Sequence, residues 1–151
     1  MNDKQLFKSF LILCQSNNVA VWADPKLERD GRGTGFWHGP PVNGHSSISV
    51  LRLNAIQVTS IQPTSSDAKI AEFIDGSQDI QVELATLLHE YGHWFFQHPT
   101  VVDNKLKYQQ EVEAWEKGEE IARKLGMQDF SIFNADKERS LAGYREGLGI
   151  K

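Results

Sequence analysis

The stretch "LLHEYGHWFFQH", residues 87–98, places two histidines four positions apart. Residues at i and i+4 lie above one another on one face of an α-helix, so His89 and His93 can point at the same ion. We expect a helix from about residue 79 to residue 97, ended by Pro99. Its apolar positions form one continuous stripe that faces a core: Ile80, Leu84, Leu87, Leu88, Tyr91 and Phe95.

The residue types in this stretch predict a catalytic zinc site. His89 and His93 supply two imidazole ligands, and Glu90 falls about 100° further around the helix, where it can reach a metal-bound water as a general base. A catalytic zinc ion takes three protein ligands and keeps a fourth position for water. The third ligand must be His, Asp or Glu, because Cys14 is the only cysteine and its apolar surroundings predict a buried, inert thiol.

A third histidine in the spacing H-E-x-x-H-x-x-G-x-x-H is excluded, since His98 comes five positions after His93 and Phe96 holds the glycine position. The segment "QQEVEAWEKGEE", residues 109–120, supplies glutamates on a second expected helix, 104–125, with Gly126 as its stop. If this helix returns antiparallel across the first, its glutamates reach the level of the histidines. Glu113 is the first choice as third ligand, and Glu116 and Glu111 are the alternatives. Gly118 in the middle of that helix predicts a close helix crossing.

Residues 78–126 resemble the small gluzincins of the ImmA/IrrE type, the minigluzincin peptidases, through "LLHEYGHWFFQH" and "EVEAWEKGEEIA". In that family the glutamate before the alanine of the second motif is the third zinc ligand, which corresponds to Glu113. The resemblance implies a zinc metallopeptidase, a hydrolase that acts on specific protein substrates. Two positions depart from the pattern: Trp115 replaces the usual asparagine, and Lys117 stands where thermolysin-type enzymes have an aspartate.

Further from the motif, the pattern changes between helical and extended. We expect a first helix over 3–16, a short strand over 19–23, further strands over 46–53 and 55–61, a short helix over 65–74 and a last short helix over 135–149, with loops between. This order predicts an α+β, zincin-like fold in which a small, mostly antiparallel sheet packs on the metal-binding helix and on the glutamate-bearing helix that follows. A length of 151 residues predicts one domain, residues 1–151.

The charge of the chain indicates which classes of binding partner to expect. The formal net charge is −4 and the chain has no block of basic residues, so we expect neither nucleic acid nor a membrane as a partner. The apolar run around residues 10–14 is too short for an export signal, which predicts a cytoplasmic protein. The expected partner is a protein or peptide substrate.

Together these features predict hydrolysis of peptide bonds at zinc held by His89, His93 and Glu113, with Glu90 as the base. The strand over 46–53 could pair with an extended substrate as an edge strand. Five residues are able to stabilise the oxyanion, and the sequence does not rank them: His38, His45, Tyr108, Tyr144 and Arg145. The alternative is a catalytically silent zincin-fold binding module with structural zinc or none, and a third reading is that the motif is a coincidence.

Overall fold

The fold was obtained as a computed structural model that describes residues 3–17, 19–23, 35–42, 45–50, 59–61, 80–99 and 101–149. Side chains are described for residues 3, 5–17, 19, 80–99 and 101–149. The helices are α1 (Asp3–Ser16), α4 (Ile80–Phe96), α5 (Asn104–Leu125) and α6 (Ser131–Leu148), and the strands are β1 (Val19–Ala23), β2 (Gly35–Val42), β3 (His45–Val50) and β4 (Thr59–Ile61).

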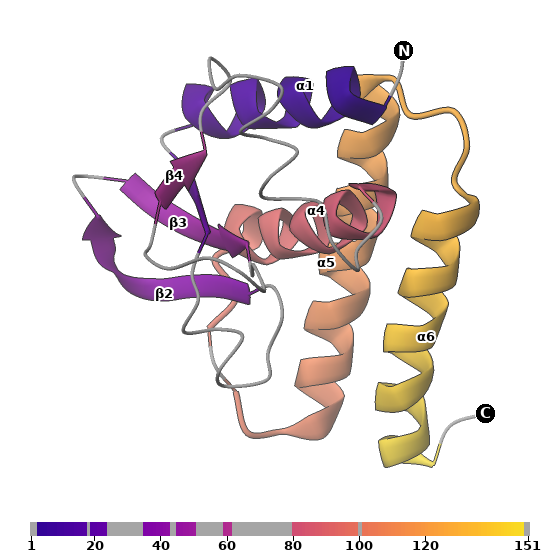
Figure 1. The fold of residues 1–151 in the computed structure, drawn as a ribbon. Helices are drawn as coiled ribbons and strands as arrows, with labels where there is room; N and C mark the ends of the chain where they lie inside the picture. Colours follow the sequence, from indigo (N-terminus) through magenta and orange to yellow (C-terminus); the bar gives the residue numbers. More distant parts are fainter. Residues whose placement is uncertain are drawn as a thin grey trace.

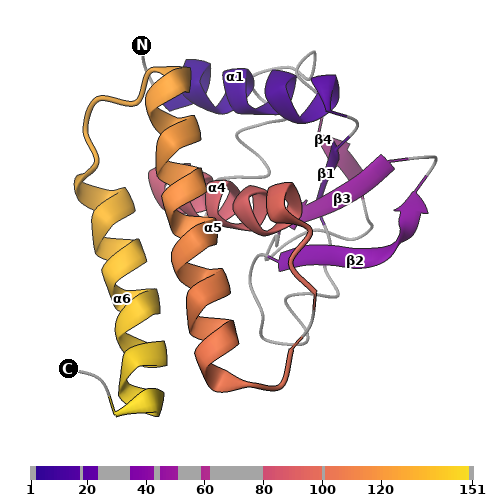
Figure 2. The same cartoon turned by 180° about the vertical axis from the view of Figure 1, so that it is seen from behind.

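Helix α4 lies at the centre of this arrangement, with the other elements around it (Figure 1). Helix α1 covers one side, and the T-shaped contact between Phe10 and Tyr91 joins the two helices with ring centroids 5.9 Å apart. The side chain of Gln81 adds a hydrogen bond to the carboxylate of Asp3, at 3.2–3.3 Å. Helices α5 and α6 lie side by side and antiparallel, and the strands lie on the opposite side of α4 (Figures 1 and 2).

Among the side chains that the structure describes, the core is built mainly by helices. Each helix contributes the stripe of apolar side chains that its sequence places on one face. Almost all the buried apolar side chains in that described set belong to α1, α4, α5 or α6, and the largest of those fully buried are Phe7, Phe10, Phe133, Leu84, Leu87 and Leu88. Val19 of β1 joins the same cluster.

The predicted α+β class, with a small and mostly antiparallel sheet packed on the metal helix, is wrong for the part of the chain whose side chains are described. Of those residues, 83% lie in four helices, and the helices pack on one another. The expectation relied on the alternating patterns of the strands, whereas the described core is formed mainly by the apolar stripes of the four helices packing on one another.

The strands form a four-stranded sheet of order β2-β3-β1-β4, and its central pair, β1 with β3, is parallel. β3 is therefore an inner strand, so the expectation that it pairs with substrate as an edge strand is also wrong. β2 was not predicted: a loop was expected from Pro40 onward, whereas residues 35–42 form a strand that contains Pro40 and Pro41. Prolines are tolerated on an edge strand at an irregularity, and the register of β2 against β3 shifts between Trp37 and Val42.

The helix boundaries were predicted well. The first helix and β1 have the expected bounds, and α5 ends where expected, with Gly126 in the left-handed conformation at φ 106°. Asp103 caps the start of α5 by accepting a hydrogen bond from the backbone N–H of Leu106, at 2.9 Å. α6 begins four residues earlier than expected, at Ser131. The short helix expected over 65–74 lies outside the described residues, and β4 covers only the end of the strand expected over 55–61.

Candidate metal centre

Two histidines of α4 form the first half of the site. His89 and His93 are one helical turn apart and point to the same side, as predicted, with their Nε2 atoms 3.1 Å apart. The apolar residues that precede them, Leu84, Leu87 and Leu88, are buried in the core and fix the helix. The histidines therefore project from a helix that is held on its other faces.

Helix α5 crosses α4 at very close range and places a carboxylate beside these two histidines. A Cβ atom added to Gly92 would lie 2.2 Å from the carbonyl oxygen of Ala114, and one added to Gly118 would lie 3.0 Å from the carbonyl oxygen of Leu88. The close crossing predicted from Gly118 is confirmed. The helices cross rather than run antiparallel as a hairpin, which corrects that expectation (Figures 1 and 2).

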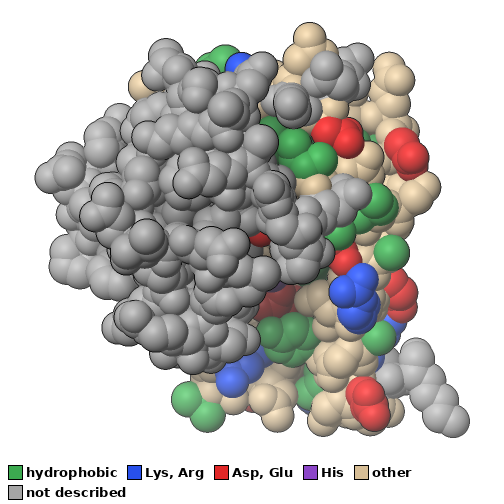
Figure 3. Space-filling model, in the orientation of Figure 1, with side chains coloured by type: hydrophobic (Ala, Val, Ile, Leu, Met, Phe, Trp, Pro, Cys, Tyr) green, Lys and Arg blue, Asp and Glu red, His purple; other side chains and the backbone are tan. Residues whose placement is uncertain are grey.

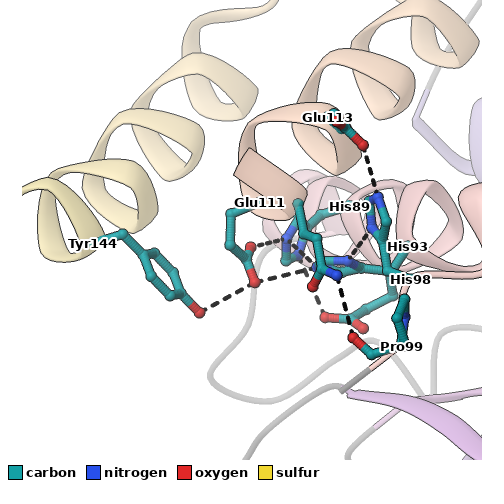
Figure 4. Close-up of polar contacts among 9 residues, drawn as sticks. His89, His93, His98, Pro99, Glu111, Glu113 and Tyr144 are labelled. Atoms are coloured by element: carbon teal, nitrogen blue, oxygen red, sulfur yellow. Dashed lines mark hydrogen bonds and ion pairs between the residues drawn. The ribbon is translucent and has the colours of Figure 1, made fainter. Parts of the chain in front are cut away.

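Glu111 is the residue that reaches the histidines (Figure 4). Its two carboxylate oxygens are divided between them: Oε2 lies 2.5 Å from His89 Nε2, and Oε1 lies 3.2 Å from His93 Nε2. The three side chains are only 11–13% exposed, so the donor atoms converge where bulk water has little access.

These three residues could hold a metal ion, because one ligand atom from each lies within 4.8 Å of the others. Two imidazole nitrogens and a carboxylate oxygen match the donor set of a catalytic zinc ion. Ligand bonds of about 2.0–2.1 Å in a tetrahedron put ligand atoms about 3.3 Å apart. The separations of 3.1 Å and 3.2 Å already fit this requirement, and the 2.5 Å contact would have to widen.

Hydrogen bonds and charges within the cluster shift the pKa values of His89 and Glu111 in opposite directions. Burial disfavours the charged form of His89, but its hydrogen bonds with Glu111 and Glu90 outweigh burial and raise its pKa to about 9. Burial likewise opposes ionisation of Glu111, yet the hydrogen bonds with both histidines hold the pKa of this carboxyl far below its usual range. Without a metal ion the cluster is therefore an imidazolium–carboxylate pair at neutral pH, and a cation that displaces the proton meets a negatively charged carboxylate.

Tyr144 of α6 extends the site to a third helix. Its hydroxyl donates a hydrogen bond to Glu111 Oε1 at 3.1 Å (Figure 4). Burial and the negative charge of Glu111 raise the pKa of Tyr144 to about 12, so the phenol keeps its proton at neutral pH and remains a donor. Of the oxyanion candidates whose side chains the structure describes, Tyr108, Tyr144 and Arg145, it is Tyr144 that contacts the cluster.

The remaining oxyanion candidates divide into two groups. Arg145 forms an ion pair with Glu138 and a hydrogen bond with Tyr108. The side chains of His38 and His45 lie outside the described part of the chain.

Trp115 packs directly on the metal centre. Its indole stacks on the ring of His89, with centroids 4.4 Å apart and planes at 17°, and Phe133 of α6 contacts its other side edge-on. Trp115 is one of the two positions at which the chain departs from the motif that residues 78–126 resemble. In this chain the position serves to pack an aromatic wall against a histidine of the site.

Glu113 and Glu116, the first choice and the runner-up for the third ligand, do not lie with His89 and His93. Glu113 Oε2 instead lies 2.9 Å from Nε2 of His98, and Glu116 is exposed. His98 in turn approaches His93, with their Nδ1 atoms 2.9 Å apart (Figure 4). The geometry favours Glu111 as the third donor and gives Glu113 a different neighbour.

Glu90, the predicted general base, lies next to the other end of the His89 ring. Its Oε1 is 3.3 Å from His89 Nδ1, while Nε2 of the same ring faces Glu111. Glu90 is 14% exposed and belongs to the cluster, but in this conformation its carboxylate orients His89.

Glu111 was the last of the three glutamates considered as the third ligand, although the sequence contains a pattern that indicates it. The buried positions of α5, Ala114, Trp115, Gly118, Ile121 and Ala122, define the face toward α4, and extending that stripe back by one turn leads to Glu111. Glu113 lies about 200° around the helix from Glu111. His98 was excluded as a zinc ligand, and its contact with His93 was not predicted, because the turn that brings it back leaves no recognisable sequence pattern.

The fold and the site define a helical protein in which an H-E-x-x-H helix and a glutamate of the next helix form a possible metal centre. Comparison with protein-family models, with curated proteins and with solved structures finds no match. Among the described residues, no helix combines the length and the apolar character that crossing a membrane requires.

Proposed function

We propose that this protein is a zinc-dependent peptidase of the gluzincin type, with His89, His93 and Glu111 as the zinc ligands. The observation that carries the proposal is the convergence of these three donors, from two helices, to within 4.8 Å of one another. The resemblance of residues 78–126 to the ImmA/IrrE-type peptidases supports the same chemistry, with Glu111 in the role that the family pattern gives to Glu113.

The residues around the cluster suit peptide hydrolysis. A zinc ion bound there would supply a water of lowered pKa and polarise a substrate carbonyl. Glu90 accepts the proton of the attacking water and passes it to the leaving amine, after its side chain turns from Nδ1 of His89 toward the Nε2 side. Tyr144, protonated at neutral pH, donates a hydrogen bond to the oxyanion that develops on the substrate.

Charge supports a protein or peptide as the partner rather than nucleic acid. Acidic, basic and hydrophobic side chains are interspersed over the described part of the face in Figure 3, in keeping with a net charge of −4. A basic stripe of the kind that follows a phosphate backbone is missing from that part of the face. The cytoplasmic location remains a prediction from the sequence.

One observation favours a second function. The contact between Glu90 and His89 Nδ1 is the kind of carboxylate–histidine bond that orients a ligand in a metal site, whether or not the site is catalytic. A binding module with a structural metal ion would use Glu90 in this way permanently.

The substitution Glu90→Gln separates the two functions. Zinc-loaded wild-type protein, Glu90→Gln and the control Glu116→Gln would each be incubated with a peptide library of natural sequences, and new peptide ends counted by mass spectrometry. If the protein is a peptidase, wild-type protein and Glu116→Gln cleave the peptides. The cleavage rate of Glu90→Gln falls by about 100-fold or more, while this variant keeps its zinc. Wild-type protein that is fully loaded with zinc but creates no new ends would favour the binding module. Equal cleavage by Glu90→Gln would contradict the role of Glu90.

A further inference from the structure

His98 lies directly beyond the end of α4, where a turn folds the chain back under His93. The backbone N–H of His98 donates to the carbonyl of His93 at 3.1 Å, and that of Gln97 donates to Trp94 at 3.0 Å. Gln97 adopts a left-handed conformation, φ 53°, between them. These are the two hydrogen bonds of a Schellman motif, with glutamine in the position that usually holds glycine. The turn therefore fixes His98 one helical turn beyond His93 and on the same side.

The side chain of His98 connects His93 to a carboxylate of α5. Its Nδ1 lies 2.9 Å from His93 Nδ1, and its Nε2 lies 2.9 Å from Glu113 Oε2. His98 is 8% exposed and stacks on Phe96, with ring centroids 5.4 Å apart, so its ring is held in this orientation. Figure 4 shows the resulting chain of contacts from Glu113 through His98 to His93.

The positions of the hydrogen atoms along this series of contacts follow from the protonation state that a metal ligand requires. If Nε2 of His93 is to bind a metal ion, it must be unprotonated, and the neutral ring then carries its proton on Nδ1. This N–H donates to Nδ1 of His98, which must be the unprotonated nitrogen of that ring. Nε2 of His98 then carries the proton and donates it to the carboxylate of Glu113, so each donor in the chain has one acceptor.

We propose that His98 and Glu113 are positioning residues of the metal centre, which hold His93 in the tautomer and orientation that expose Nε2 to the ion. The proposal rests on the proposed zinc site and adds to it two residues that do not bind the ion. A carboxylate paired directly with a ligand histidine orients it and raises its basicity, and in this proposal Glu113 acts on His93 in the same way through His98. Nδ1 of His89 contacts Glu90 and not His98 or Glu113, so the proposed chain acts on His93 alone.

The test compares two glutamates three residues apart on α5. Glu113→Gln removes the charge at the end of the chain, and Glu116→Gln makes the same change at an exposed carboxylate outside it. Zinc affinity would be measured by competition with a chelator. We expect Glu113→Gln to weaken zinc binding by about 10–100-fold, the usual effect of losing a partner of a ligand, and Glu116→Gln to leave it unchanged.

A second variant and a second readout guard against a loss of folding. His98→Phe keeps a ring to stack on Phe96 but removes both hydrogen bonds, and it should weaken zinc binding at least as much as Glu113→Gln. Thermal unfolding of the metal-free variants reports any general destabilisation. In ¹⁵N-histidine spectra of the zinc-loaded protein, His98 should be a neutral ring protonated on Nε2.

The outcomes distinguish this proposal from the zinc site itself. If wild-type protein binds no zinc, the proposed function fails together with the inference. If wild type binds zinc and Glu111→Gln weakens it, but Glu113→Gln and His98→Phe bind as tightly as Glu116→Gln, the metal centre stands and the positioning role is wrong. A His98 ring protonated on Nδ1 in the zinc-loaded protein would also overturn it.

Discussion

Cys14 shows how strongly a single position in this molecule depends on its surroundings. The residue is 1% exposed within the helical core, and burial raises the pKa of its thiol well above the ordinary value. A protonated and inaccessible thiol is a poor nucleophile, in agreement with the expectation of an inert cysteine. Burial, together with the charge that Cys14 would carry, raises the pKa of Tyr91 to about 12.

This burial predicts a loss of stability at alkaline pH. The unfolded thiol titrates at about 8.5, whereas the folded thiol retains its proton to higher pH. The folded state therefore binds more protons as the pH rises through about 8.5, and the free energy of unfolding falls with a slope that approaches about 1.4 kcal/mol for each pH unit above that value. Below pH 8.5 this contribution is fully present. Tyr91 begins to contribute only above pH 10.

Urea unfolding at pH 7.5, 8.5 and 9.5 measures this effect, with Cys14→Ala as the control that should lack it. Alkylation by iodoacetamide at pH 8 should be at least 100-fold slower in the folded protein than in urea. Rapid alkylation of the native protein, or the same pH dependence in Cys14→Ala, would show that burial of Cys14 does not govern this behaviour.

At the scale of elements, the crossing of α4 and α5 determines the site. Helix glycines lack a Cβ atom, so backbones can approach at Gly92 and Gly118 more closely than at any other residue type. Glu111 lies one turn before Ala114, the residue that contacts Gly92, and it therefore reaches the histidines on either side of that glycine. The glycine of "HEYGH", Gly92, is thus part of the helix contact that places the third donor.

Substituting three helix glycines by alanine tests this crossing. Gly92→Ala places a Cβ 2.2 Å from a backbone oxygen, which forces the helices apart and should cost about 3 kcal/mol of stability or more. Gly118→Ala, with its closest contact at 3.0 Å, should cost about 1 kcal/mol. Gly143→Ala on α6 meets nothing within 4 Å and should stabilise the protein by about 0.5–1 kcal/mol through helix propensity.

Urea unfolding of the metal-free proteins gives the three values, and the order is the decisive result. Gly92→Ala should also weaken zinc binding, because it moves Glu111 away from His89 and His93. If Gly92→Ala is as stable as Gly143→Ala, the helices do not cross as described.

At the scale of the whole molecule, periodicity predicted the helices but not how they are arranged. α1, α4 and α5 were found within a few residues because each has an apolar stripe and a recognisable end, such as Pro99 or Gly126. The crossing angle of α4 and α5 depends on how side chains interlock along both helices, and no single segment contains that information. The wrong angle led to Glu113 instead of Glu111. The same limit applies to β2, whose strand conformation depends on its place at the sheet edge.

The proposed function requires α4 and α5 together to bind one zinc ion. The measurement that tests it most directly is the zinc content and affinity of wild-type protein beside Glu111→Gln and Glu116→Gln. We expect one zinc ion per chain in wild type and in Glu116→Gln, and a loss of about 100-fold or more in affinity for Glu111→Gln. Absence of zinc from wild-type protein after zinc is supplied, or equal affinity in Glu111→Gln, would contradict the claim.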